Sequence, residues 1–332
     1  MALEQSALPI KDEIDLIDRM TTPSSEVVRA VSGIDDGLMI LGVGGKMGPT
    51  LAQLLVRAGA KRVLGVSRFT DSGQRKGLEA AGVRTIRCDL LDDADLRALP
   101  EAGHIFLLAG YKFGSIGNEP LMWALNALVP ARVMRRFPEA RIVTVSSGNV
   151  YGLSDADKAG SKETDPLEPV GEYAQSRLAG ERVVQYYGTR NRTPALIVRL
   201  FYASELRYGV IVDIATRVWH RRPIDLSVGF VNQIWQGDAN ACLARSLSLC
   251  QTPPGIINVC GPEVLSVRRL AVRIGELMGS EPIFEGQESE RALLGDASEC
   301  VRVFGSPAVY DAGSEPLLDA LNAYCSSSRF RQ

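Results

Sequence analysis

The sequence predicts an α/β fold, with a doubly wound parallel sheet and a smaller C-terminal domain. Three observations lead to this prediction: short apolar runs alternate with amphipathic stretches from Gly37 onward, a glycine-rich turn follows the first apolar run, and prolines become frequent after Phe201. Strands that alternate with helices are typical of parallel sheets, because a parallel connection needs a crossover segment. The 332 residues, 45% of them hydrophobic, are enough for one large or two modest domains.

Six strands are predicted from the apolar runs, at 38–41, 62–66, 83–87, 105–108, 141–145 and 195–200. The segments between them are expected to be helices. Two of these segments carry a clear apolar face at helical spacing, namely 49–58 with Leu51, Leu54 and Leu55, and 121–136 with Leu121, Leu125, Leu128 and Val133. Before the first strand, a helix is expected to start at Ser24 or Ser25 and to run through Val31.

These elements divide the chain into three parts. Residues 1–36 form an N-terminal helical extension, which either covers a subunit surface or, as we favour, packs as an ordinary extension. Residues 37–203, together with about 230–260, form the predicted dinucleotide-binding domain. Residues 204–229 and 261–332 form the predicted substrate domain, where the alternation of strand and helix loosens.

Composition argues against several classes of function. The net charge is −2 and there is no basic run, so a nucleic-acid partner is not expected. Six scattered cysteines and two isolated histidines offer no metal site, and they indicate a cytoplasmic protein with reduced thiols. No apolar stretch approaches the roughly 20 residues that span a bilayer, so no membrane partner is expected.

The glycine-rich turn predicts a phosphate site. Gly42, Gly45 and Gly48 follow the first strand and lead into a helix, with Lys46 and Met47 between the last two glycines. Glycines let a backbone approach a pyrophosphate closely, and the N-terminus of a helix attracts its charge. The spacing misses the GxGxxG pattern by one position, and the alternative is a plain tight turn. Its place between a strand and a helix favours a Rossmann-type dinucleotide site.

The ends of the next strands give candidates for the rest of the cofactor. Ser67 and Arg68 follow the second strand, where an acidic residue would bond the ribose of NAD; serine and arginine can bind a 2′-phosphate, so NADP is slightly favoured over NAD. Asp89 follows the third strand and either accepts a hydrogen bond from the adenine or is a surface turn residue. Further candidates for cofactor contacts are Leu90, Leu108, Ala109 and Gly110.

A second motif predicts proton transfer. Ser147 follows the fifth strand, and Tyr173 is followed four residues later by Arg177. A tyrosine titrates near pH 10 in water, so it becomes a useful acid or base at neutral pH when a nearby positive charge stabilises its phenolate. Residues four apart on a helix share a face, which places Arg177 beside Tyr173.

Several motifs resemble, in order, the extended short-chain dehydrogenase/reductase family, the group that includes nucleotide-sugar epimerases and dehydratases. They are Gly42, Gly45 and Gly48; 107–109; Asn126; Ser147 with 150–152; 163–167 leading to Tyr173; Arg199; and 257–261. The resemblance covers nearly everything from 38 to about 324. It implies an enzyme in which Tyr173 is the acid/base and Ser147 orients the substrate oxygen, with Asn126 as a further candidate catalytic residue.

The chain departs from the family at the position of its lysine, since the motif is YxxxR in place of YxxxK. The resemblance implies that Arg177 lowers the pKa of Tyr173 and bonds the nicotinamide ribose. A guanidinium keeps its proton, however, so relay of a proton through this position is in doubt. Lys112, in the loop after the fourth strand, either restores an ammonium to the site or, as we favour, is an ordinary solvated lysine.

Two further departures narrow the chemistry. Gly148 and Asn149 stand where dehydrating relatives carry carboxylates, so elimination of water is not expected. Tyr202 replaces an asparagine that touches a nucleotide-sugar phosphate in relatives, which weakens the nucleotide-sugar interpretation. Arg207 either grips an anionic group of the substrate or forms a salt bridge with Glu205. The substrate candidates are Lys112, Ser147, Gly148, Asn149, Tyr202 and Arg207.

The sequence thus predicts an NAD(P)-dependent oxidoreductase or epimerase of carbohydrate metabolism that moves a hydride to and from a hydroxyl carbon of a sugar or sugar-like substrate. Dehydrogenase and epimerase use the same residues and both remain open. The alternative is a dinucleotide-binding regulatory protein with little or no turnover. By resemblance, a homodimer through the helices that contain Asn126 and Tyr173 is expected.

Overall fold

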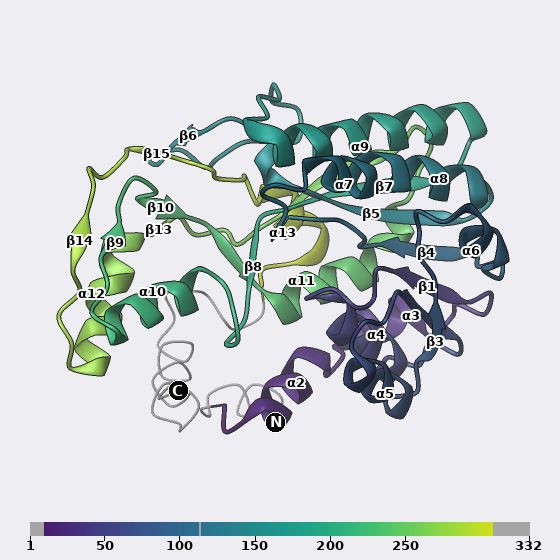
Figure 1. Ribbon diagram of the computed structural model, residues 1–332, viewed down its shortest axis with the longest axis horizontal. Helices are drawn as coiled ribbons and strands as arrows, with labels where there is room; N and C mark the ends of the chain where they lie inside the picture. Colours follow the sequence, from purple (N-terminus) through teal and green to yellow (C-terminus); the bar gives the residue numbers. More distant parts are fainter. Residues whose placement is uncertain (1–9, 113, 308–332) are drawn as a thin grey trace.

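The computed structural model of the protein describes residues 10–112 and 114–307. Within these ranges the chain forms a seven-stranded sheet in the order β12-β7-β5-β4-β1-β2-β3, with every neighbouring pair parallel (Figure 1). The strands are β1 Leu38–Leu41, β2 Val63–Ser67, β3 Arg84–Arg87, β4 His104–Leu107, β5 Arg141–Ser147, β7 Ala195–Leu200 and β12 Gly255–Val259. The predicted α/β class and parallel sheet are confirmed.

The central strands read as unbroken apolar runs because they are covered on both faces. All four residues of β1 are buried, as expected for a parallel strand between two helical layers. Leu41, at the end of β1, pairs with Val66 of β2 and Leu107 of β4. The loops that follow these three strands therefore open at the same edge of the sheet.

Helices lie against both faces of the sheet (Figure 1). On one face are α3 Ser25–Val31, α4 Gly48–Arg57, α5 Ser72–Ala80 and α11 Gln236–Arg245; on the other are α6 Asp93–Ala98, α8 Val129–Arg136 and α9 Gly171–Asn191. The Ser24 side chain accepts a hydrogen bond from the Val27 N–H, so Ser24 caps α3 as one of the two predicted starts. The helix predicted at 49–58 corresponds to α4.

The helix predicted at 121–136 is present but is not regular. It begins as α7 Glu119–Trp123, continues through a π-helical segment at Ala124–Leu128, and ends as α8. Pro130 has no N–H with which to bond the carbonyl of Asn126, so the regular hydrogen-bond pattern cannot continue there. Gly180 of α9 gives this carbonyl room, since a Cβ at position 180 would lie 2.2 Å from the Asn126 oxygen.

A second lobe is built on α10 Val210–Trp219 and α12 Val267–Met278, which share one apolar cluster. Its short strands, with those that connect it to the sheet, are β6 Ser154–Asp155, β8 Tyr202–Ser204, β9 Ile224–Asp225, β10 Phe230–Val231, β11 Gln233–Trp235, β13 Leu265–Ser266, β14 Phe284–Glu285 and β15 Arg291–Ala292. Helix α13 Ser298–Phe304 and the 3-10 turn Ser246–Leu249 pack on the sheet instead, and the 3-10 turn Gly148–Val150 follows β5. Helix α2 Glu13–Thr21, which the sequence analysis did not predict, contributes Leu16 and Met20 to this cluster. Helix α2 of the N-terminal extension thus packs against the lobe, whereas α3 packs against the sheet. Residues 308–332 of the predicted substrate domain lie outside the described residues.

Candidate active site

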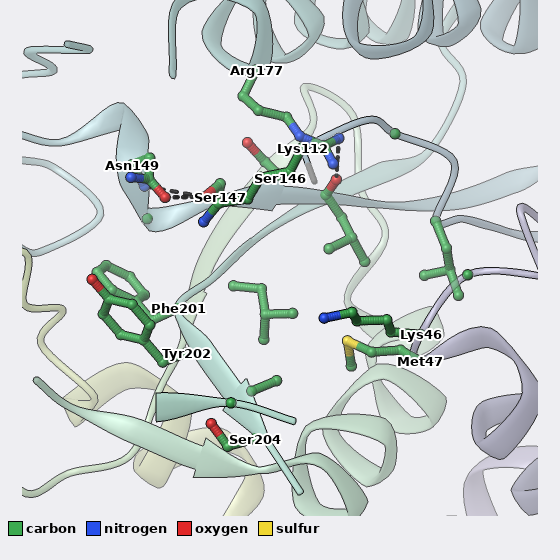
Figure 2. A pocket seen from close by; sticks show the side chains of 18 of the residues that line it. Lys46, Met47, Lys112, Ser146, Ser147, Asn149, Arg177, Phe201, Tyr202 and Ser204 are labelled. Carbon is green, nitrogen blue, oxygen red and sulfur yellow. Dashed lines mark hydrogen bonds between the residues drawn. The ribbon is translucent and has the colours of Figure 1, made fainter. Parts of the chain in front are cut away.

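A cavity of about 710 Å³ lies at the carboxyl ends of the central strands (Figure 2). Its wall includes Gly42 after β1, Leu108 after β4, Ser147 at the end of β5 and Leu200 at the end of β7. The direction of the strand order changes between β1 and β4, and ligands of open α/β sheets bind at such a point. The predicted site residues that line the cavity are Gly42, Gly45, Lys46, Met47, Gly48, Leu108, Gly110, Lys112, Ser147, Gly148, Asn149, Tyr173, Arg177 and Tyr202.

The glycine turn has the shape that a pyrophosphate requires. Gly42 has a φ of +92°, and a Cβ there would lie 2.6 Å from the Ala109 nitrogen. A Cβ at Gly48 would lie 2.3 Å from the Val43 oxygen. The first turn of α4 receives no side-chain cap, so its N–H groups remain available to an anion. The turn and the start of α4 therefore fit the phosphates of a dinucleotide.

The residues predicted to hold the adenosine end lie beyond the wall of this cavity. Ser67 packs on the glycine turn, since a Cβ at Gly44 would lie 2.5 Å from its Oγ, and Arg68 follows it in an exposed position. The Asp89 carboxylate accepts a hydrogen bond from the Leu91 N–H at 2.9 Å. The contacts predicted for these residues, and for Leu90 and Ala109, stay predictions.

Tyr173 and Arg177 meet as their spacing predicts. Both lie on α9, where the Arg177 Nε donates to the Tyr173 Oη at 3.3 Å and the Arg177 Nη1 donates to the Val145 carbonyl at 3.3 Å. Burial, the largest single effect, raises the pKa of the Tyr173 phenol, whereas the charges of Arg177 and Lys112 lower it. With hydrogen bonds from Ser147 and Arg177, they hold the pKa of Tyr173 below its ordinary value. The phenol is thus prepared to lose its proton.

Gly110 makes room for the guanidinium of Arg177. A Cβ at position 110 would lie 2.1 Å from the Arg177 Nη2, which is less than any normal contact. The sequence analysis named Gly110 only as a candidate for cofactor contact. Its packing on Arg177 joins two residues from different elements, so no local pattern reports it.

Ser147 presents its hydroxyl at the end of β5. Its Oγ accepts a hydrogen bond from the Asn149 N–H at 3.2 Å and donates to the Asn149 Oδ1 at 3.0 Å. Gly148 is required behind it, because a Cβ there would lie 2.4 Å from the Phe201 ring. Phe201 and Tyr202 form the wall across the cavity from Arg177 (Figure 2).

Asn126 and Arg207, predicted as catalytic and substrate-binding residues, do not line the cavity either. The Asn126 side chain is buried, accepts a hydrogen bond from the Tyr111 N–H, and donates to the Tyr111 carbonyl and the Ser176 Oγ. It is therefore placed to position other residues. Arg207 forms salt bridges with Glu205 at 2.7 Å and with Glu13 at 3.0 Å. The salt bridge with Glu205 that was one alternative for Arg207 is present, and its predicted substrate contact stays a prediction.

A buried ion pair supports the site from behind. The Arg199 Nη2 lies 2.8 Å from the Glu181 Oε2, and both side chains are almost completely inaccessible to solvent. Glu181 also accepts a hydrogen bond from the Ser146 hydroxyl, which lies beside Ser147 in the cavity wall. Glu181 was not predicted as a site residue, although it follows Arg177 by four residues on the helical face that carries Tyr173.

The second lobe closes one end of the cavity with residues that the sequence analysis did not single out as site residues. The Lys46 Nζ lies 4.3 Å from the centroid of the Tyr208 ring, which links the glycine turn to this lobe. Asp213, on the exposed face of α10, and Leu293 complete this part of the wall. The amphipathic pattern of α10 places Asp213 on its polar face, so the sequence held a signal for this residue. Leu293 lies in a segment without helical or strand periodicity, so no sequence pattern indicates it.

Neither a metal cluster nor a membrane-crossing helix is found in the described part of the chain. No group of three or more His, Cys, Asp or Glu side chains is placed there to hold a metal ion. No helix within residues 10–112 and 114–307 is long and apolar enough to cross a membrane.

Comparison with curated proteins and solved structures places this fold among known relatives. Two dTDP-4-dehydrorhamnose reductases of Mycobacterium tuberculosis strains are each 27% identical over 164 residues, which is 46% of this chain and 47% of theirs, so the match spans about half of those relatives. UDP-glucuronic acid 4-epimerase of Bacillus cereus in complex with NAD has a TM-score of 0.71 at 19% identity, over 86% of this chain and 96% of that one.

DesIV, a dTDP-glucose 4,6-dehydratase of Streptomyces venezuelae with NAD and TYD bound, has a TM-score of 0.73 at 20% identity, over 88% of this chain and 98% of that one. These structural likenesses show the fold. The profile of the NAD dependent epimerase/dehydratase family matches residues 38–204, which is just over half of the chain and contains the glycine turn, Ser147, Tyr173 and Arg177. The protein therefore belongs to the NAD dependent epimerase/dehydratase family.

Proposed function

We propose that the protein is an NAD(P)-dependent oxidoreductase or epimerase that acts on a hydroxyl-bearing carbon of a sugar or sugar-like substrate. The observation that carries this proposal is the meeting of Tyr173, Arg177 and Ser147 in one cavity with the glycine turn. Family membership supports an enzyme of this kind. The bound nicotinamide would supply or accept the hydride, as it does in dehydrogenases generally.

The residues of the chain divide the remaining tasks. Tyr173 exchanges a proton with the substrate hydroxyl at its Oη, and Arg177 stabilises the phenolate that forms. Ser147 donates a hydrogen bond to the same substrate oxygen. The glycine turn and the start of α4 bind the pyrophosphate.

NADP is the slightly favoured cofactor. Arg68 is an exposed cation at the end of β2, next to Ser67, and a guanidinium suits a phosphate. Relatives were solved with NAD, so the preference is decided by titration. Calorimetry with NAD, NADH, NADP and NADPH, on protein stripped of nucleotide, is expected to give tighter and exchangeable binding of NADP or NADPH. Tight retention of NAD contradicts this preference and favours an epimerase.

Net oxidation, net reduction and epimerisation all remain within the proposal, whereas elimination of water does not. Gly148 and Asn149 place no carboxylate beside Ser147 to take a proton from carbon. One relative is named a reductase and a solved neighbour a 4-epimerase, which agrees with hydride chemistry at a sugar carbon. A homodimer through α7, α8 and α9 and a cytoplasmic location stay predictions.

The test is turnover of wild type and Tyr173→Phe on a panel of sugars, nucleotide sugars and polyols. Oxidation and reduction are measured by the absorbance of the reduced nicotinamide, and epimerisation is measured by chromatography of the products. Loss of general acid–base catalysis is expected to slow turnover by about 100-fold or more. Full turnover by Tyr173→Phe contradicts the assignment. Tight nucleotide binding with no turnover of any substrate favours the regulatory alternative.

A further inference from the structure

Two cations from different elements flank the ring of Tyr173. The Lys112 Nζ lies 5.1 Å from the centroid of the ring, and the Arg177 Cζ lies 5.5 Å from it. Arg177 belongs to α9, whereas Lys112 belongs to the loop after β4. Figure 2 shows both side chains on the same side of the cavity. Lys112, expected to be an ordinary solvated residue, is therefore part of the site.

One buried amide bonds residues on both sides of this arrangement. The Asn126 Oδ1 accepts from the Tyr111 N–H at 2.9 Å, and its Nδ2 donates to the Tyr111 carbonyl at 3.1 Å and to the Ser176 Oγ at 3.0 Å. Tyr111 precedes Lys112, and Ser176 precedes Arg177. Asn126, which lies in the π-helical segment, thus holds the Lys112 loop against the helix that carries Tyr173.

The two cations differ in what they can do with a proton. A guanidinium remains protonated in proteins, so Arg177 can stabilise a phenolate but cannot return a proton to it. An ammonium, unlike a guanidinium, can donate a proton and then regain one from water. Lys112 is exposed, so it also has access to water at the mouth of the cavity.

We propose that Lys112 is the residue that returns the proton to Tyr173. Arg177 then stabilises the phenolate, and Lys112 supplies the proton. When the Tyr173 Oη gives its proton to the substrate oxygen, that O–H bond breaks and a phenolate remains. Lys112 then donates a proton from Nζ to Oη, and its neutral amine takes a proton from water. Oxidation reverses these transfers. The inference rests on the proposed role of Tyr173 as acid/base.

The groups that lower the pKa of Tyr173 come from three elements. Arg177 belongs to the same helix, Lys112 to the loop after β4, and the Ser147 hydroxyl to β5. Both cations lower the pKa of Tyr173, against the effect of burial. Removal of the charge of Lys112 must therefore raise this pKa, whereas an arginine at position 112 preserves the charge but cannot pass on a proton.

The first measurement needs neither substrate nor cofactor. The ultraviolet absorbance of tyrosinate is followed against pH for the full chain, and the curve of Tyr173→Phe is subtracted so that Tyr173 alone is seen. Lys112→Met is expected to move this titration to higher pH, and Lys112→Arg to leave it in place. Lys76→Met, which removes an exposed lysine of α5, is the matched control and is expected to change nothing. A wild-type titration in Lys112→Met overturns the proposal.

The second measurement is turnover on the best substrate of the panel. Lys112→Arg is expected to turn over at least about 10-fold more slowly than wild type, because the relay is lost while the charge remains. Added methylamine is expected to restore part of the rate in Lys112→Ala and none in Arg177→Ala. Wild-type turnover by Lys112→Arg, or a change confined to nucleotide affinity, overturns the relay. Failure of the proposed function is seen separately, as full turnover by Tyr173→Phe.

Discussion

Gly110→Ala tests whether the position of the Arg177 guanidinium controls the reactivity of Tyr173. The added methyl group would lie 2.1 Å from the Arg177 Nη2, 2.8 Å from Nη1 and 2.7 Å from Cζ. Ordinary contact begins at 3.4 Å, so the guanidinium must move by about 1.3 Å, the difference between 3.4 and 2.1 Å. Both hydrogen bonds that hold it, to Tyr173 and to Val145, are already 3.3 Å long, so we expect this movement to break them.

The expected loss follows from those hydrogen bonds. A hydrogen bond to a charged group contributes about 1.5–3 kcal/mol net. Displacement of Arg177 from Tyr173 is therefore expected to slow turnover by roughly 10- to 100-fold, since each 1.36 kcal/mol of barrier changes the rate about tenfold. The tyrosinate titration of Tyr173 is expected to move to higher pH, because the charge that lowers its pKa has moved away.

The assay combines turnover, the Tyr173 titration and nucleotide affinity by calorimetry. Gly77→Ala is the control, since a Cβ at position 77 meets nothing within 4 Å. Gly110→Ala is also made together with Arg177→Lys, whose narrower side chain avoids the methyl group. In that background the alanine at position 110 is expected to reduce turnover much less than it does in wild type. An equal loss of turnover in both backgrounds, or an unchanged Tyr173 titration in Gly110→Ala, refutes the reasoning. The effect of the alanine would then be assigned to cofactor contact.

Two further predictions concern pH dependence and stability. Oxidation needs the Tyr173 phenolate, so the rate of oxidation is expected to rise with pH through the pKa of Tyr173, which lies below its ordinary value of 10.0, and the rate of reduction is expected to fall over the same range. Arg177→Met is expected to move both changes to higher pH. Rate profiles that do not move contradict the role of the guanidinium. Glu181→Gln leaves the buried charge of Arg199 uncompensated and is expected to lower the free energy of unfolding in urea by about 3–5 kcal/mol, whereas Glu79→Gln at a surface ion pair changes it little. An unfolding midpoint unchanged in Glu181→Gln would show that the pair is dispensable.

Much of the sheet could be predicted because each buried strand is a local apolar run. The predicted second and fourth strands were each displaced by one residue, since they are Val63–Ser67 and His104–Leu107, and β12 was not among the six predicted strands. Helix α2 was not predicted, although Asp12 accepts a hydrogen bond from the Asp15 N–H at its start. Its buried side chains, Leu16 and Met20, pack on a cluster whose other members come from the second lobe. The π-helical break was likewise missed, because it needs Gly180 of another helix to receive the displaced carbonyl.

The sequence by itself determined the parallel sheet, the glycine turn and the pairing of Tyr173 with Arg177, because each depends on residues within one element or its adjoining turn. The tertiary structure alone decided that Lys112 lies over the Tyr173 ring, that Arg199 is buried against Glu181, and that Arg207 is held by Glu205 together with Glu13 of a distant helix. Periodicity reports which face of an element is buried. It does not report which distant charge meets that face, and in this site such meetings decide where a proton can go.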